Sequence, residues 1–235
     1  MNFFAGETIA IDKPYKISSF GALAHVRYLL TQRMNGTKVK VGHAGTLDPL
    51  ATGVLILCTG KATKKIEGLQ QHTKEYVATM QLGATTPSYD MEHEVNATFP
   101  TSHITREAIL EAITHFLGNI EQVPPSYSAC KIDGERAYAL RRSGEEVKLK
   151  PKNIRIDDIE IIDFDAETMR LTLRVVCGKG TYIRALARDL GRALNSGAYL
   201  TALRRTRVGD FRVEEAISYE HFSEWLEKQE IEGEK

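Results

Sequence analysis

The chain has 235 residues, 42% hydrophobic and 26% charged, with 31 Lys and Arg against 31 Asp and Glu, which suits one large globular domain or one domain with an inserted segment. No run of about 18 apolar residues is present, and the N-terminus lacks a basic start and a long apolar stretch, so a membrane span and a signal peptide are not expected. Cys58, Cys130 and Cys177 lie far apart without metal-type spacing, which indicates reduced thiols in a cytoplasmic protein.

The charges are distributed unevenly. Residues 1–90 carry 10 Lys and Arg against 6 Asp and Glu, and residues 171–212 carry 9 against 2. Residues 91–170 and 213–235 are acidic. A polyanion would therefore meet a local basic surface formed by the first and third of these stretches. Charge alone, however, favours chance clustering plus a solvated acidic tail.

The first third of the chain predicts one helix and three strands. Residues 18–33 predict a helix with Ser18 as its N-cap and one face formed by Phe20, Leu23, Ala24 and Leu30. Residues 37–41 alternate as a strand does, and residues 54–59 form a continuous apolar run typical of a buried strand. Residues 75–83 predict a strand with one face formed by Tyr76, Ala78, Met80 and Leu82.

The remaining chain continues this mixture. Residues 105–118 predict a helix with a threonine cap and a terminal glycine, and residues 168–177 predict another alternating strand. Residues 181–191 predict a helix that ends at Gly191 as its C-cap. Strands and helices alternate without a regular βαβ period, so the predicted fold class is α+β, with a mixed sheet that carries helices.

The stretch GHAGTLDPLATG, residues 42–53, contains three glycines and an Asp-Pro pair. On its own, Asp48 followed by proline is typical of a helix start, with aspartate as N-cap. A reactive loop is the alternative, because the stretch lies between a predicted strand and the buried run, where sheet proteins often place functional groups. Its glycines, Gly42, Gly45 and Gly53, would let the backbone approach a ligand closely.

Arginines recur later in the chain. Arg184, Arg188 and Arg192 are spaced by four residues along one helical face, which fits a basic stripe that faces solvent or touches phosphate. The segment LRRTRVG (203–209) adds three more arginines. The acidic and histidine residues lack zinc spacing, so no metal site is predicted.

Five segments, in order, resemble the successive motifs of the bacterial tRNA pseudouridine synthase B (TruB) family. They are GHAGTLDPLATGVL, KEYVATMQLG, PPSYSACKIDGERAY, CGKGTYIRALARDLG and LRRTRVG. The resemblance covers nearly the whole chain, from IDKP (11–14) to LRRTRVG. It implies the pseudouridine-synthase fold, a mixed and mostly antiparallel sheet flanked by helices and loops, with an inserted flexible segment that grips RNA.

The resemblance also implies an activity, the isomerisation of uridine 55 in the T loop of tRNA to pseudouridine. The bond from N1 to C1′ breaks, the base rotates, and C5 bonds to C1′, after the base has been flipped out of the RNA. This chemistry needs no metal and no organic cofactor. Attack at C6, attack at C1′ and a glycal route all remain open, and a secondary role in tRNA folding is compatible with the same residues.

By the same resemblance, Asp48 is the catalytic aspartate and Arg184 is its cationic partner. Tyr76 stacks on the target base near C5, although its apolar neighbours fit core packing equally well. His43 fills the space that the flipped base leaves, although a lone loop histidine bonded to backbone is the simpler explanation. The other implied contacts to RNA are Gly42, Lys131, Lys179, Tyr182, Leu203, Arg204 and Arg205.

The expected organisation is a catalytic domain over residues 1–212, with residues 119–152 as a mobile insertion, and a short acidic helix or tail over residues 213–235. Many family members carry a C-terminal RNA-binding PUA domain, and we expect this chain to be a short form without it. The expected partner is tRNA, bound by a cytoplasmic monomer without membrane or obligate protein partners. An RNA-folding module without chemistry would explain the basic segments equally, but it would not require Asp48. A hydrolase with an aspartate nucleophile would leave the arginine clusters unexplained.

Overall fold

The computed structural model describes residues 1–127, 131–132, 135–136 and 149–232. The chain divides into two compact units. Unit 1 contains Met1–Glu75 and Arg204–Lys235, and unit 2 contains Tyr76–Leu203. Among the described residues, no helix is both long enough and apolar enough to cross a membrane.

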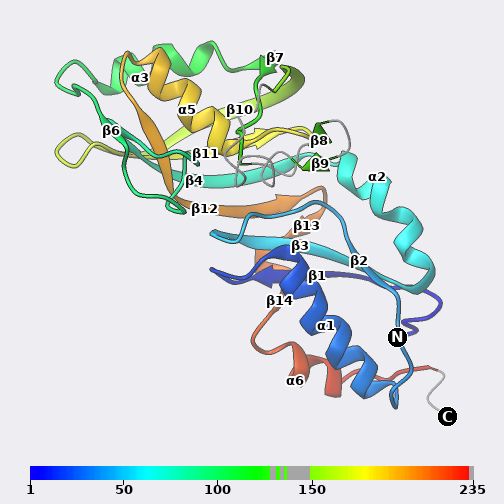
Figure 1. Cartoon of the computed structure of the whole chain (residues 1–235). Helices are drawn as coiled ribbons and strands as arrows, with labels where there is room; N and C mark the ends of the chain where they lie inside the picture. Colours follow the sequence, from blue (N-terminus) through cyan, green and yellow to red (C-terminus); the bar gives the residue numbers. More distant parts are fainter. Residues whose placement is uncertain (128–130, 133–134, 137–148, 233–235) are drawn as a thin grey trace. The chain divides into compact units, whose positions relative to one another are not determined.

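Unit 1 is built on a sheet with the strand order β14-β1-β3-β12, in which β2 pairs with β3 and β13 pairs with β12 (Figure 1). Strands β1 and β14 are parallel, whereas β1 and β2 each run antiparallel to β3. The elements are β1 (Thr8–Lys13), α1 (Ser19–Arg33), β2 (Val41–His43), β3 (Ala51–Thr59), η1 (Gly60–Lys65), α2 (Ile66–Gln71), the end of β12 (Ala198–Val208), β13 (Phe211–Arg212), η2 (Val213–Glu215), β14 (Ile217–Ser218) and α6 (Phe222–Glu227).

Strand β3 is buried on both faces, which confirms the buried strand predicted from its apolar run. Leu55 and Leu57 pack in one cluster with buried residues of α1 and α6. Val54, Ile56 and Cys58 alternate with them and pack in a second cluster. A strand with apolar residues on both faces has to lie in the interior of a sheet, and β3 lies between β1 and β12.

Helix α1 begins where the sequence predicts, because the Ser18 hydroxyl accepts a hydrogen bond from the Gly21 amide at 2.9 Å. Its predicted buried face is partly wrong. The buried positions are Ala22, Leu23, Val26 and Leu30, whereas Phe20 is 65% exposed. At 3.6 residues per turn, position 20 lies about 100° from the centre of the buried face.

The strand predicted over residues 37–41 is displaced. Strand β2 begins only at Val41, which pairs with Thr59 at the end of β3. The carbonyl of Lys40 instead accepts a hydrogen bond from the Gly60 amide at 2.9 Å. Residues 37–40 therefore precede the strand. The partner strand β3 ends at Thr59, opposite Val41, so no further residue of β3 is left to pair with Lys40.

The acidic C-terminal residues complete the core of unit 1. Strand β14 pairs with β1, and the side chains of Phe222 and Leu226 in α6 are 0% and 3% exposed. Both pack in the same cluster as α1. These residues thus include a strand and a buried helix, where the sequence predicted only a helix or tail. The proposed boundary at residue 212 stays a prediction.

Unit 2 contains a sheet with the strand order β12-β4-β11-β10-β7 and two short hairpins, β5-β6 and β8-β9. Strand β10 runs antiparallel to both β11 and β7. The elements are β4 (Lys74–Leu82), β5 (Ala84–Thr85), β6 (Ala97–Thr98), α3 (Arg106–Thr114), β7 (Gly118–Gln122), β8 (Lys131–Ile132), β9 (Glu135–Arg136), β10 (Lys152–Asp165), β11 (Arg170–Cys177), α5 (Ile183–Ala193) and β12. Mixed strands and helices confirm the predicted α+β class.

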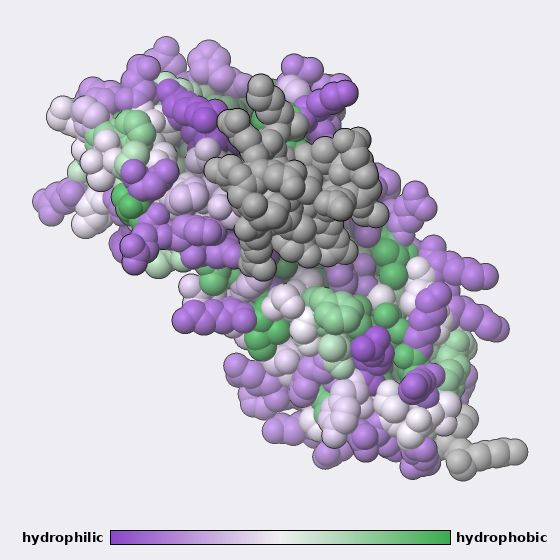
Figure 2. Space-filling view, in the orientation of Figure 1, coloured by the Kyte–Doolittle hydropathy of each residue, from purple (hydrophilic) through white to green (hydrophobic). Residues whose placement is uncertain are grey.

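The predicted alternation of buried side chains is confirmed in β4 and β11, although β11 begins at Arg170, and Met169, within the predicted strand, lies in the preceding turn. Side chains are buried at alternate positions of β4, and Leu171, Leu173 and Val175 are buried in β11. Helix α5 extends past its predicted end, and Gly191 lies inside it, where an added Cβ would come within 2.5 Å of the Ala198 amide nitrogen. This glycine therefore serves close packing instead of a C-cap. Most of the visible surface is hydrophilic, with scattered apolar residues (Figure 2).

Helix α3 begins as predicted, because the Thr105 hydroxyl accepts a hydrogen bond from the Ala108 amide. It ends earlier than predicted, at Thr114, with His115 as its C-cap. Gly118, the expected terminal glycine, is the first residue of β7 and has a φ of 83°. The glycine therefore marks the entry into a strand.

Candidate active site

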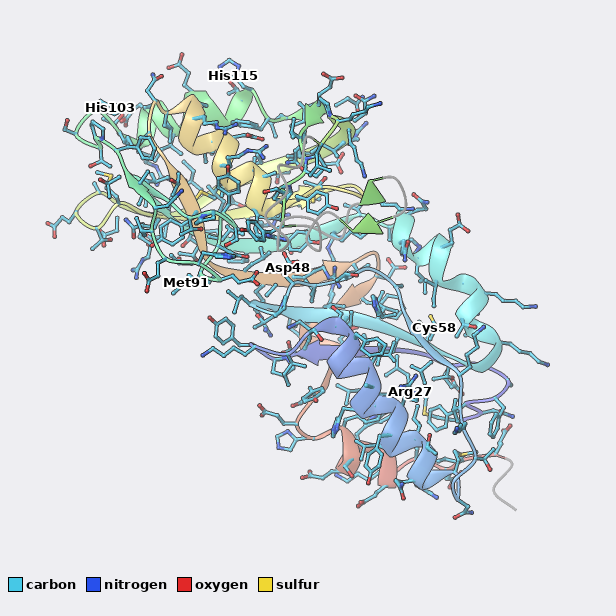
Figure 3. The ribbon with its side chains drawn as sticks, viewed as in Figure 1. Arg27, Asp48, Cys58, Met91, His103 and His115 are labelled. Atoms are coloured by element: carbon cyan, nitrogen blue, oxygen red, sulfur yellow. The ribbon has the colours of Figure 1, made fainter. Side chains whose placement is uncertain are left out.

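Asp48 lies in the loop that joins β2 to β3 in unit 1 (Figure 3). Its carbonyl accepts a hydrogen bond from the Ala51 amide at 3.1 Å, so residues 48–51 form a tight turn with proline at its second position. Strand β3 begins at Ala51, and no helix follows. The helix N-cap interpretation is therefore wrong, and the half-buried carboxylate belongs to a turn at the start of a buried strand.

Glycines shape this loop in different ways. Gly45 and Gly53 have φ values of 97° and 103°, a region that favours glycine. A Cβ at Gly53 would also lie 2.2 Å from the carbonyl oxygen of Arg205. Gly42 lacks a positive φ, but a Cβ there would come within 2.6 Å of Ile66. The close approach of backbone is thus an internal packing requirement at Gly53, whereas at Gly42 the near atom is the end of the flexible Ile66 side chain.

Arg205 supports the loop from within unit 1. Its Nε donates to the Val54 carbonyl at 2.8 Å, and its Nη2 and Nη1 donate to the carbonyls of Gly45 at 3.1 Å and Thr46 at 3.5 Å. The residue is 1% exposed. A side chain this buried does not present its guanidinium to RNA, so the structure replaces the predicted RNA contact with a structural contact to the loop.

Lys13 is a second buried cation at this loop, and sequence analysis assigned it no role. It is 0% exposed, and its Nζ donates to the carbonyls of Ile17 at 2.6 Å, Pro14 at 2.8 Å and Pro49 at 3.4 Å. Burial lowers the pKa of Lys13 from 10.5 to about 8, and the negative charge of Asp48 opposes this shift. The ammonium and the carboxylate therefore attract each other across the turn.

His43 lies on β2 opposite Leu57 of β3. Burial, and then the positive charge of Arg205, lower its pKa below the usual value, so the imidazole is neutral at pH 7. Within the described part of the chain, its buried Nδ1 has no hydrogen-bond partner. The expected bond from this histidine to backbone is thus not formed through Nδ1.

Arg204 differs from its neighbour Arg205. Its guanidinium binds both carboxylate oxygens of Asp12, at 2.7 and 3.1 Å, and it donates to the Thr52 hydroxyl at 3.3 Å. Its side chain is 42% exposed. A contact from Arg204 to RNA stays a prediction, and it would have to coexist with this ion pair.

In unit 2, Arg184 of α5 is 5% exposed and pairs with a carboxylate that sequence analysis did not single out. Its Nε lies 3.6 Å from Asp90 Oδ2, and its Nη1 donates to the Ser88 carbonyl at 3.2 Å. Asp90 Oδ1 accepts from the Ser88 hydroxyl at 2.5 Å and from the Glu92 amide at 3.0 Å. The carboxylate of Asp90 is therefore held through Oδ1, and its Oδ2 faces the guanidinium of Arg184.

The predicted ion pair between Asp48 and Arg184 joins residues of different units and stays a prediction. The same holds for Tyr76, which lies on β4 of unit 2 with 8% exposure. Its burial fits the core packing that its position predicted. Leu203, at the end of unit 2, is partly exposed.

The residues before α5 have different exposures. Tyr182 is the N-cap residue, and its amide and carbonyl bond to the side-chain oxygen and nitrogen of Gln122, at 2.9 and 3.2 Å. Lys179 is exposed, and its contact to RNA stays a prediction. Lys131 lies in β8 and pairs with Arg136, and most of the predicted insertion around it falls outside the described residues.

The predicted stripe of three arginines is not one surface. Arg188 is 7% exposed, and it binds both oxygens of the Asp189 carboxylate and the Val123 carbonyl. Its guanidinium also lies 5.5 Å from the centre of the Tyr89 ring. The Arg192 side chain is 68% exposed. Spacing of four thus put these side chains along one helix, but only Arg192 faces solvent.

Comparisons with known proteins identify the family of the chain. Residues 32–183 match the family described as "TruB family pseudouridylate synthase (N terminal domain)", and residues 184–235 match "tRNA pseudouridylate synthase B C-terminal domain". A protein of Bacteroides thetaiotaomicron named tRNA pseudouridine synthase B is 62% identical over 100% of this chain and 99% of its own. One of the same name from Flavobacterium johnsoniae is 50% identical over 96% and 98%.

A solved structure described as a Cbf5-Nop10-Gar1 complex contains a chain that is similar with a TM-score of 0.70 and 29% identity. The match covers 97% of this chain and 57% of that one. A chain of an H/ACA RNP bound to a substrate RNA is similar with a TM-score of 0.67 and 27% identity. The chain therefore belongs to the TruB family of pseudouridylate synthases, which are isomerases, and has the pseudouridine-synthase fold.

Proposed function

We propose that the protein isomerises uridine 55 in the T loop of tRNA to pseudouridine, with Asp48 as the catalytic carboxylate. The observation that carries the proposal is identity of 62% over the whole chain with a protein named tRNA pseudouridine synthase B. The Asp48 loop supports it, because hydrogen bonds from Lys13 and Arg205 hold its backbone and thereby limit where the carboxylate can lie. A tRNA substrate places the reaction in the cytoplasm.

The reaction conserves all heavy atoms of the uridine. The bond between N1 and C1′ breaks, C5 bonds to C1′, the proton of C5 leaves to solvent and N1 gains a proton. A carboxylate can manage the detached base or sugar as a nucleophile, and a second group has to remove the C5 proton. Attack by Asp48 at C6, attack at C1′ and a glycal route all use the same carboxylate.

Arg184 and Tyr76 complete the proposed site. Arg184 provides a fixed positive charge for the Asp48 carboxylate, and Asp90 positions its guanidinium at 3.6 Å. Tyr76 supplies a ring for stacking on the flipped base, close to C5. His43 supplies a neutral ring for the space that the base leaves in the RNA, since its pKa is lowered by burial and by Arg205. A neutral ring enters a base stack more readily than an imidazolium does.

The test is to map pseudouridine after incubation with unmodified tRNA. The tRNA carries uridine at position 55, and a control tRNA carries cytidine there. We expect one pseudouridine per tRNA, at position 55, and none in the control. Modification at another uridine with position 55 untouched would refute the proposed specificity. The role in tRNA folding stays a prediction, which the rate of tRNA folding with an inactive Asp48→Asn variant would test.

A further inference from the structure

An exposed group of aromatic and basic side chains spans the connection from β1 to α1 and the first turn of α1. Tyr15, Lys16 and Phe20 form this group, which we call the 15–20 cluster. Tyr15 is 46% exposed and Phe20 is 65% exposed, and Lys16 is also exposed. Two large aromatic rings are thus kept in solvent within six residues, beside a cation.

One end of the cluster is fastened to the residue before Asp48. The Ser19 hydroxyl donates to the Leu47 carbonyl at 2.9 Å and accepts from the Leu47 amide at 2.8 Å. Ser19 is 2% exposed, so this pair of bonds is shielded from water. Phe20 follows Ser19 directly, and its backbone is therefore held close to that of Asp48.

The other end is fastened to the residue after Asp48. The buried ammonium of Lys13 donates to the Pro14 and Ile17 carbonyls, which flank Tyr15 and Lys16, and to the Pro49 carbonyl. The connection and the Asp48 turn thus share one cation. Both ends of the cluster belong to unit 1, so its position beside Asp48 depends on this unit alone.

The chemistry of the cluster fits RNA. Residues 13–47 contain six Lys and Arg and no Asp or Glu, and the next acidic residue is Asp48. The Nζ of Lys16 lies 5.6 Å from the centre of the Tyr15 ring, which holds the ammonium at the surface. An ammonium suits a phosphate, and the free ring of Phe20 suits a base. An exposed cation beside exposed rings fits an unpaired nucleotide better than it fits an apolar protein patch.

We propose that Phe20 stacks on an unpaired nucleotide that flanks the target uridine, and that Lys16, held over Tyr15, contacts a phosphate of the same strand. This inference rests on the proposed function, since it assumes an RNA substrate at Asp48. It adds a binding site next to the reacting base, on a part of the chain that the five motifs do not include.

The experiment compares exposed residues of the cluster with exposed residues farther along α1. The test variants are Phe20→Ala, Phe20→Tyr and Lys16→Gln. The controls are Tyr28→Ala, which removes a ring that is 60% exposed, and Arg27→Gln. Arg27 lies well apart from Asp48 within unit 1 (Figure 3). All variants alter exposed side chains, so circular dichroism should show unchanged folding.

Filter binding to an unmodified T-arm hairpin gives the dissociation constant at several salt concentrations, and tritium release from the same preparations gives activity. We expect Phe20→Ala to weaken binding about 5- to 150-fold, and Phe20→Tyr to restore most of it. Lys16→Gln should reduce the slope of log affinity against log salt by about 0.7 to 0.9, the share of one phosphate. Tyr28→Ala and Arg27→Gln should leave both quantities unchanged.

The proposal is overturned if Phe20→Ala and Lys16→Gln bind as the controls do. A wild-type protein that binds the hairpin but releases no tritium would refute the proposed function, while the binding comparison would still decide whether the cluster contacts RNA. A wild-type protein that does not bind the hairpin would refute both.

Discussion

Replacing Arg205 by methionine should lower the free energy of unfolding of unit 1 by about 2–4 kcal/mol. Methionine has an unbranched side chain but cannot donate the hydrogen bonds that reach Val54, Gly45 and Thr46. The Val54 carbonyl is buried, and leaving it unsatisfied costs about 1–3 kcal/mol. The two loop carbonyls can reach water after a small movement and lose about 0.5–1.5 kcal/mol each. Relief from burying the guanidinium charge offsets part of this sum.

Fluorescence of Trp225 during urea unfolding measures this loss, because it is the only tryptophan of the chain and packs on Phe222 in unit 1. The matched control is Arg207→Met on the same strand, where a partly exposed guanidinium lies 3.7 Å from Glu75. The control should lose less than about 1 kcal/mol. Because Arg205 no longer holds the Asp48 loop, the Arg205→Met variant should also isomerise uridine about 100-fold more slowly than the wild type. Equal stability losses in both variants would refute the role of Arg205 as the support of the loop.

Four other substitutions test the geometry around Asp48 and the core of unit 1. Asp48→Asn removes the negative charge that counteracts the lowering of the Lys13 pKa by burial. The Lys13 pKa should therefore fall below about 8 in an NMR titration of ¹³Cε-labelled lysine. An unchanged pKa would contradict the attraction between the two side chains. Unfolding returns the Lys13 pKa to about 10.5, so between pH 8 and 10.5 the unfolded chain binds more protons than the folded one. The free energy of unfolding of the wild type should therefore rise with pH over that window relative to that of Lys13→Met. Parallel pH dependences of the two proteins would count against a buried ammonium. Gly53→Ala should lower the free energy of unfolding in urea by at least about 3 kcal/mol, because its Cβ would lie 2.2 Å from a backbone carbonyl oxygen of β12 at a φ of 103°. A loss below about 1 kcal/mol would show that the two strands can move apart. Phe222→Ala should lower the free energy of unfolding by about 3–5 kcal/mol, since the ring is fully buried. A loss below about 0.5 kcal/mol would instead indicate a mobile tail.

The parts of the fold that depend on local pattern could be predicted from the sequence. The unbroken apolar run of β3 requires burial on both faces. Ser18 is the N-cap of helix α1, which begins at the next residue. The face of α1 was harder to predict, because Phe20 is apolar and lies at the edge of the buried arc. Only the packing of Leu23, Val26 and Leu30 decides that this ring stays in solvent.

The supports of the candidate site could not be predicted, because each depends on contacts between distant residues. Asp90 and Arg184 are separated by 94 positions, and Asp90 is one of several acidic residues in its loop. Arg205 looks like its neighbours in a run of arginines, and only the close approach of β3 and β12 buries it. Lys13 left a weak signal, since it follows Ile9 and Ile11 at the inward positions of an alternating strand.

The proposed role of the Asp48 carboxylate in the isomerisation of uridine 55 can be tested directly. Release of tritium from C5 of that uridine measures this directly, with Asp48→Asn compared with the wild type at saturating tRNA. The wild type should release one tritium per tRNA and the Asp48→Asn variant none, although the variant still unfolds cooperatively in urea and still binds tRNA. Release by Asp48→Asn at the wild-type rate would show that this carboxylate does not carry out the reaction.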